Sequence, residues 1–108
     1  MWDKRVVEAI LRAAREDLRQ QRWARDFSDK LKQRGISVAQ ILKTVSLQSF
    51  IVLYWHEGKA SVGFWHPETY LVAVWSPLGI GKWVTAFRRN LAYLFEREGC
   101  EILWHPQR

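Results

Sequence analysis

The sequence has few of the residues that build disulfide frameworks or membrane spans. Its single cysteine, Cys100, excludes an internal disulfide, so nothing requires an oxidising compartment. The longest apolar runs, such as residues 49–55, are far too short to cross a bilayer. Charges begin at Asp3 and Lys4, which leaves no apolar core for a signal peptide. We therefore expect a cytoplasmic protein of one domain, residues 1–108, with no membrane partner.

The composition is that of a globular protein with a basic surface. Hydrophobic residues make up 48% of the 108 residues and charged residues 26%, which argues against disorder. Lys and Arg exceed Asp and Glu by 17 to 11, giving a net charge of +6, and this favours anionic partners. Seven tryptophans are the one compositional anomaly.

The first 34 residues contain neither proline nor glycine and carry apolar residues at helical spacing. One apolar stripe consists of Val7, Leu11, Ala14 and Leu18, and a second consists of Trp23, Phe27 and Leu31. The second stripe is rotated away from the first, because five residues separate Leu18 from Trp23. Either the helix bends near Gln20 and Gln21, or one helix meets different partners along its length. Gly35 is expected to end this region.

A short helix and a sheet are predicted next. Ser37 and Gln40 form a capping-box pattern, and after residue 47 the apolar period changes from helical to two. Strands are predicted at residues 49–56, 60–66, 70–76 and 82–89, then a short helix at 91–98 and a fifth strand at 101–105. We therefore expect an α+β fold, with N-terminal helices packed on one face of a four- to five-stranded antiparallel sheet.

Alternation along these strands predicts a tryptophan-rich sheet face opposite the helices. With a bulged turn at Gly58, this face includes Trp55, Trp65 and Trp75. The other face, beneath the helices, then includes Phe50, Val52, Tyr54, Ala60, Val62 and Phe64. Three interpretations of the tryptophan face remain open: burial under a helix or the C-terminal segment, an interface with a second copy or a protein partner, and a platform for unpaired bases.

Most familiar catalytic motifs are missing. Residues 79–82 (GIGK) lack the Walker spacing, and Trp83 stands where Ser or Thr is needed. The three histidines and one cysteine show no zinc-ligand spacing, so we predict neither metal nor cofactor. The remaining candidates are imidazole and basic groups at strand ends and along the fourth strand: His56, His66, Lys82, Thr85, Arg88 and Arg89. Imidazole can act as acid or base, and cations can stabilise a phosphorane, as a metal-independent ribonuclease requires.

Two segments resemble a known superfamily. Residues 63–74 (GFWHPETYLVAV) and 82–88 (KWVTAFR) show a strand, a proline turn, a strand, a loop and Val-Thr-x-Phe. Residues 26–37 (DFSDKLKQRGIS) resemble a helix that typically reads His-Ala-x-x-Arg-x-x-x-Arg-Gly-Ile. Over residues 26–89 the chain is thus similar to small toxin ribonucleases of the barnase–EndoU–colicin–RelE-like superfamily. The resemblance implies an RNA-directed toxin.

The resemblance also assigns roles to particular residues. Arg34 matches the second arginine of that helix, and Lys30 stands where the first would be. Thr85 matches the threonine of the final strand and Arg88 the cation beyond it. The chain departs from the pattern at Asp26, where a histidine is expected. An aspartate can act as a base but not as a cationic acid, which leaves room for a relative that only binds RNA.

From these patterns we predict a small basic protein that binds or cleaves RNA without metal. The expected nucleic-acid contacts are Lys30, Arg34, Lys82, Arg88 and Arg89, and the expected catalytic residues are His66, Thr85 and Asp26. The alternative is a non-catalytic interaction module, which forms a homodimer or binds a protein through Trp55, Trp65 and Trp75.

Overall fold

Three helices precede the sheet in the computed structural model, which describes residues 1–80 and 82–106. They are α1 (Lys4–Arg19), α2 (Phe27–Arg34) and α3 (Val38–Thr44). Of the two alternatives for residues 1–34, the structure shows a break near Gln20 and Gln21 and not one continuous helix: α1 ends at Arg19, and Gln21 adopts a left-handed φ of 57° before α2 begins. Gly35, with a φ of 64°, ends α2, and the predicted capping box of Ser37 and Gln40 opens α3.

Five antiparallel strands follow: β1 (Phe50–His56), β2 (Lys59–Trp65), β3 (Leu71–Trp75), β4 (Trp83–Arg88) and β5 (Glu101–Trp104). Their order across the sheet is β4-β3-β2-β1-β5. Between β4 and β5 lies α4 (Ala92–Phe95), which is shorter than the helix predicted at 91–98. The predicted α+β class is confirmed, including the fifth strand.

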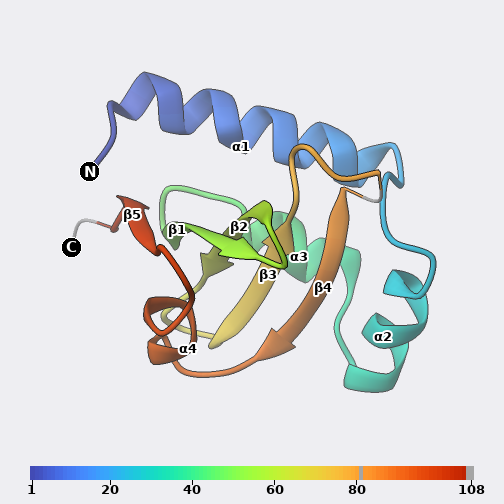
Figure 1. Cartoon of the computed structure of the whole chain (residues 1–108). Coiled ribbons are helices and arrows are strands. Elements are labelled where there is room, and N and C mark those ends of the chain that lie inside the picture. Colours follow the sequence, from blue (N-terminus) through green and yellow to red (C-terminus); the bar gives the residue numbers. More distant parts are fainter. Residues whose placement is uncertain (81, 107–108) are drawn as a thin grey trace.

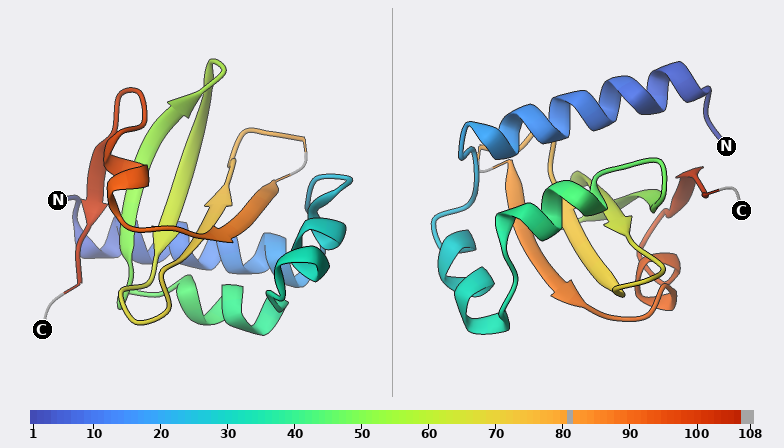
Figure 2. Two further views of the ribbon diagram at one scale, coloured as in Figure 1. Left: turned by 90° about the horizontal axis from the view of Figure 1, so that it is seen from below. Right: turned by 180° about the vertical axis from the view of Figure 1, so that it is seen from behind.

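The helices lie on both sides of the sheet, but unequally. α1, α2 and α3 cover the face that we call the helix face, whereas only α4 packs on the opposite one, the α4 face (Figures 1 and 2). The larger core, on the helix face, includes Phe64, Leu71, Trp75 and Trp83. The smaller core, on the α4 face, packs Val52, Tyr54, Trp65, Val72 and Val74 around Leu94.

The predicted assignment of β1 side chains to the helix face is wrong. The turn between β1 and β2 is a two-residue turn with positive φ at Glu57 (51°) and Gly58 (76°), so no bulge shifts the register. Leu53 therefore lies opposite Val62, and Phe50 opposite Trp65. Because a shift of one residue exchanges the faces, Phe50, Val52 and Tyr54 lie on the α4 face.

The predicted tryptophan face is also wrong. Trp75 is buried on the helix face and donates from Nε1 to Asp17 Oδ2 at 2.9 Å. Trp65 is buried on the α4 face and donates to the carbonyl oxygen of Arg89 at 2.8 Å. Trp55, at the end of β1, is 49% exposed. The three tryptophans therefore do not form one surface through which a second copy or a protein partner could bind, and two of them are core residues.

Three residues of the chain are not described by the structure. Residue 81, in the loop predicted between β3 and β4, lies outside the described residues, as do 107–108. Within the described residues, no helix combines the length and apolar content that crossing a membrane would need.

Candidate functional site

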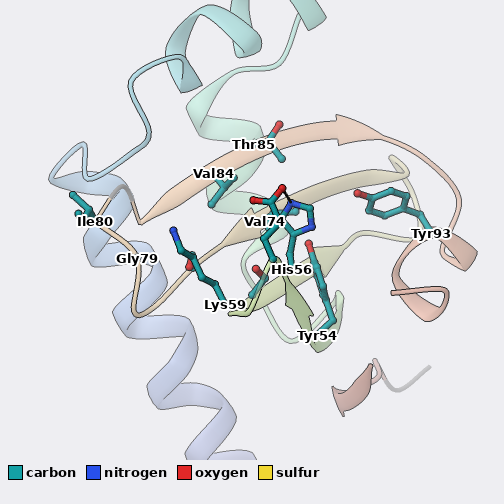
Figure 3. A pocket seen from close by; sticks show the side chains of 12 residues that line it. Tyr54, His56, Lys59, Val74, Gly79, Ile80, Val84, Thr85 and Tyr93 are labelled. Carbon is teal, nitrogen blue, oxygen red and sulfur yellow. Dashed lines mark ion pairs between the residues drawn. The ribbon is translucent and has the colours of Figure 1, made fainter. Parts of the chain in front are cut away.

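A groove of about 360 Å³ lies on the α4 face of the sheet (Figure 3). Its floor is formed by Tyr54, Ser61, Val74 and Thr85, which come from four adjacent strands. The β1–β2 hairpin supplies His56, Glu57 and Lys59, α4 supplies Tyr93, and the loop after β3 supplies Gly79 and Ile80. Because α4 is only four residues long and the floor side chains are mostly short, this part of the face is left hollow.

The hairpin places three groups of different chemistry at the edge of the groove. His56 and Glu57 are adjacent, with 3.8 Å between Nε2 and Oε1, and this contact is an ion pair when the imidazole is protonated. Lys59 lies directly across from His56 in the antiparallel pairing. The side chain of His56 is 64% exposed and that of Glu57 is 83% exposed, so both can reach a ligand. An imidazole, a carboxylate and an ammonium group therefore share one hairpin.

Two tyrosines and two arginines line or flank the groove. Burial raises the pKa of Tyr54 above its usual range; Tyr93 adds to the rise and Arg97 opposes it. Tyr54 therefore remains a neutral phenol at physiological pH. The guanidinium carbon of Arg97 lies 4.2 Å from the centre of the Tyr93 ring, and that of Arg89 lies 5.3 Å from it. This region suits a ligand with negative charge.

Three of the residues predicted from the sequence lie in or near the groove. Thr85 lines it, and its hydroxyl accepts a hydrogen bond from Arg34 Nη1 at 2.9 Å. The same nitrogen donates to the carbonyl oxygen of Ala86 at 2.9 Å, so α2 is tied to β4. Arg89 is the residue whose guanidinium contacts Tyr93. The structure thus brings Arg34 and Thr85 together at the edge strand β4 and places Arg89 beside Tyr93 of the groove.

The other predicted residues lie elsewhere. His66 is buried after β2 and lines a separate cavity together with Arg88. Asp26 precedes α2, and its carboxylate lies 3.3 Å from Lys30 Nζ. Lys82 donates to the carbonyl oxygen of Pro77. His66, Thr85 and Asp26, predicted as a catalytic set, therefore do not line a common pocket.

Sequence reasoning missed most of the groove. The sequence marks His56 as a candidate functional residue because it lies at a strand end. It does not mark four other residues that line the groove, namely Tyr54, Glu57, Lys59 and Tyr93. A signal was present, because His-Glu-Gly-Lys between two strands places ionisable groups around a tight turn. The assumed bulge concealed it, since it placed Tyr54 beneath the helices.

The fold and groove define a small α+β protein with a polar groove on the less covered face of its sheet. Within the described residues, no group of three or more His, Cys, Asp or Glu side chains is arranged to hold a metal ion. Comparison with known protein families, with curated proteins and with solved structures gave no match.

Proposed function

We propose that this protein binds single-stranded RNA in the groove on the α4 face and cleaves it with groups of the β1–β2 hairpin. The observation that carries the proposal is the grouping of His56, Glu57 and Lys59 at one end of the groove. Cleavage of RNA needs a base for the 2′-hydroxyl, an acid for the 5′-oxygen and positive charge at the phosphorus. These three residues supply one group of each kind.

Each group has a defined role in this proposal. The Glu57 carboxylate takes the proton of the 2′-hydroxyl as the 2′-oxygen forms a bond to phosphorus. The bond from phosphorus to the 5′-oxygen breaks, and the His56 imidazolium gives its proton to that oxygen. Lys59 stabilises the extra negative charge of the phosphorane. The products are a 2′,3′-cyclic phosphate and a 5′-hydroxyl, and one proton is taken from the RNA for each proton that is given to it.

The remainder of the groove supports binding of the strand. The Tyr93 ring lines the groove and holds the guanidinium groups of Arg89 and Arg97 beside it. Arg89 and Arg97, which contact this ring, can each neutralise a phosphate. The net charge of +6 favours approach of a polyanion.

The backbone at Glu57 adopts a conformation that is unfavourable for glutamate. Glu57 has a φ of 51° in a two-residue turn, where asparagine or glycine is preferred. A non-glycine residue in the left-handed region costs of order 1 kcal/mol. The Glu57 carboxylate therefore stands where asparagine or glycine would cost less.

The experiment is an RNA cleavage assay with the full chain, a fluorescent single-stranded RNA and a metal chelator. Glu57→Gln and His56→Ala should each reduce the cleavage rate at least about 100-fold, in the range of general acid–base catalysis. Lys59→Ala should reduce it by a similar factor, whereas RNA binding by the Glu57→Gln protein should persist. His105→Ala removes an exposed histidine that does not line the groove and serves as the matched control.

RNA affinity is measured in parallel as a function of salt. Binding releases cations from the RNA, and this release is less favourable when the salt concentration is high. The affinity should therefore fall steeply between about 50 and 200 mM salt. Wild-type protein that binds RNA but leaves it intact would contradict the catalytic roles. Absence of binding at low salt, or binding that does not change with salt, would contradict the proposal as a whole.

A further inference from the structure

A second cavity, of about 150 Å³, lies on the helix face, between α3 and the ends of β2 and β4. It is lined by His66, which directly follows β2, by Lys43 and Gln40 of α3, and by Arg88 at the end of β4. The hairpin of the groove adjoins the opposite end of β2, about 20 Å away along a strand of seven residues. The two cavities share no lining residue.

His66 is the most unusual residue of this cavity. Its side chain is buried, with 4% of the residue exposed, and its Nδ1 accepts a hydrogen bond from the backbone N–H of Glu68 at 3.2 Å. An atom that accepts needs a lone pair, so the neutral ring carries its hydrogen on Nε2. Within the described residues, this buried Nε2 finds no hydrogen-bond partner. His66 therefore holds an unmatched donor, which is rare in a protein interior.

The polar neighbours of the cavity also have donors to spare. Gln40 uses its Oε1 to accept from the N–H of Ser37, which leaves its amide hydrogens available. The Thr69 hydroxyl accepts from the N–H of Leu71, which leaves its own hydrogen available. Arg88 and Lys43 form no ion pair within the described residues.

Among the described residues, the one carboxylate that lines the cavity is that of Glu68, an exposed residue. Lys43 and Arg88 therefore outnumber it. A site with several donors, an excess of positive charge and little room selects a small, acceptor-rich anion.

We propose that this cavity is a binding site for a phosphate group, held by Arg88 and Lys43 beside the His66 ring, whose Nε2–H is buried and unpaired within the described residues. A phosphate offers several acceptor oxygens, and a guanidinium matches two of them at once. A nucleoside is too large for the cavity, so the ligand is inorganic phosphate or the terminal phosphate of a larger molecule. This site is separate from the RNA groove and does not depend on it.

The test measures binding of inorganic phosphate to the full chain at constant ionic strength, set with chloride. Increasing phosphate should raise the melting temperature in a saturable way, because a ligand that binds only the folded state stabilises it. It should also shift the resonances of the His66 ring in NMR spectra. Arg88→Ala and Lys43→Ala, at exposed positions where the fold should tolerate the change, should each weaken binding about tenfold or more.

Two control variants make the test specific. Arg89→Ala removes the neighbouring exposed arginine, which does not line the cavity, and should leave phosphate affinity unchanged. Lys59→Ala, in the groove, should also leave it unchanged. A saturable signal that Lys59→Ala abolishes and Arg88→Ala does not would assign phosphate to the groove and overturn the proposal. Absence of any saturable signal with every phosphate probe would overturn it as well.

A second probe identifies the source of the phosphate. A short RNA with a 5′-phosphate is compared with the same RNA carrying a 5′-hydroxyl. Tighter binding of the phosphorylated RNA that Arg88→Ala abolishes would support a terminal phosphate as the ligand. Equal binding of the two RNAs, together with saturable binding of inorganic phosphate, would support the free ion.

Discussion

The guanidinium of Arg34 donates a hydrogen bond to the hydroxyl of Thr85, 51 residues further along the chain, at 2.9 Å. It also donates to the carbonyl oxygen of Ala86, so one side chain of α2 binds both a side chain and the backbone of β4. β4 is an edge strand, and its other end is covered by a backbone bridge between Trp23 and Trp83. Together these contacts protect an edge that is otherwise free to pair with another chain.

Replacement of Arg34 by alanine should lower the free energy of unfolding by about 1–2 kcal/mol, because two hydrogen bonds are lost and the Ala86 carbonyl loses a partner. Gln33→Ala, at the adjacent exposed position, should change it by less than about 0.5 kcal/mol. Urea unfolding of the three proteins measures both values. Equal stability of the two variants would show that the Arg34 contacts do not hold α2 to β4.

Replacement of Glu57 by asparagine should stabilise the protein and inactivate it. Asparagine tolerates the left-handed backbone of this turn better than glutamate does, so we expect a gain of about 0.5–1 kcal/mol in unfolding free energy. The RNA cleavage rate should fall, because the proposed base is removed. Thermal unfolding and the cleavage assay, run on the same preparation, check both effects. A destabilised variant would contradict the strain assigned to this turn.

Stability should decrease above about pH 10 through Tyr54. Burial raises the pKa of this phenol in the folded state, whereas the unfolded chain has the ordinary value of about 10. Above pH 10 the unfolded state has lost the proton and the folded state retains it, so the unfolding free energy falls by about 1.4 kcal/mol per pH unit. Below pH 10 both states are protonated and the contribution is constant.

The variant Tyr54→Phe isolates this contribution. Between pH 10 and 11 its unfolding free energy should fall by about 1 kcal/mol less than that of the wild type, because the unfolded phenol is only half ionised at pH 10. Tyr70→Phe, at an exposed tyrosine, provides the comparison and should retain the wild-type slope. Urea titrations at several pH values supply the data, and identical slopes for wild type and Tyr54→Phe would contradict the assignment.

Two of the buried tryptophans, Trp65 and Trp75, should each contribute to stability, from opposite faces of the sheet. Trp65→Phe and Trp75→Phe should each lower the unfolding free energy by about 1–3 kcal/mol, because each leaves a buried acceptor unpaired. Trp55→Phe, at a half-exposed position, should cost less than about 0.5 kcal/mol. If Trp55→Phe proved the most destabilising of the three, the burial assigned to Trp65 and Trp75 would be wrong.

Local features of the fold could be predicted because their signals lie within a few residues. The apolar stripe from Val7 to Leu18 specifies the buried side of α1, and the reciprocal bonds of Ser37 and Gln40 specify the start of α3. The change of apolar period after residue 47 predicts the bounds of all five strands to within about one residue. The helix α4 is shorter than its predicted range of 91–98. These features follow from local backbone and side-chain preferences.

The sheet faces and the candidate site were decided by the tertiary structure. The sequence of residues 56–59, His-Glu-Gly-Lys, is compatible with a bulged turn or a two-residue turn. The two turns differ by one residue in the strand register, and this shift moves Tyr54 from one face of the sheet to the other. The packing of whole strands against α1, α3 and α4 selects between them. The groove combines the hairpin, Thr85 and Tyr93, which lie far apart in the chain, and only the structure shows that the Nε2 of His66 is buried without a partner among the described residues. Contacts between distant segments depend on register and packing, which local sequence preferences do not encode.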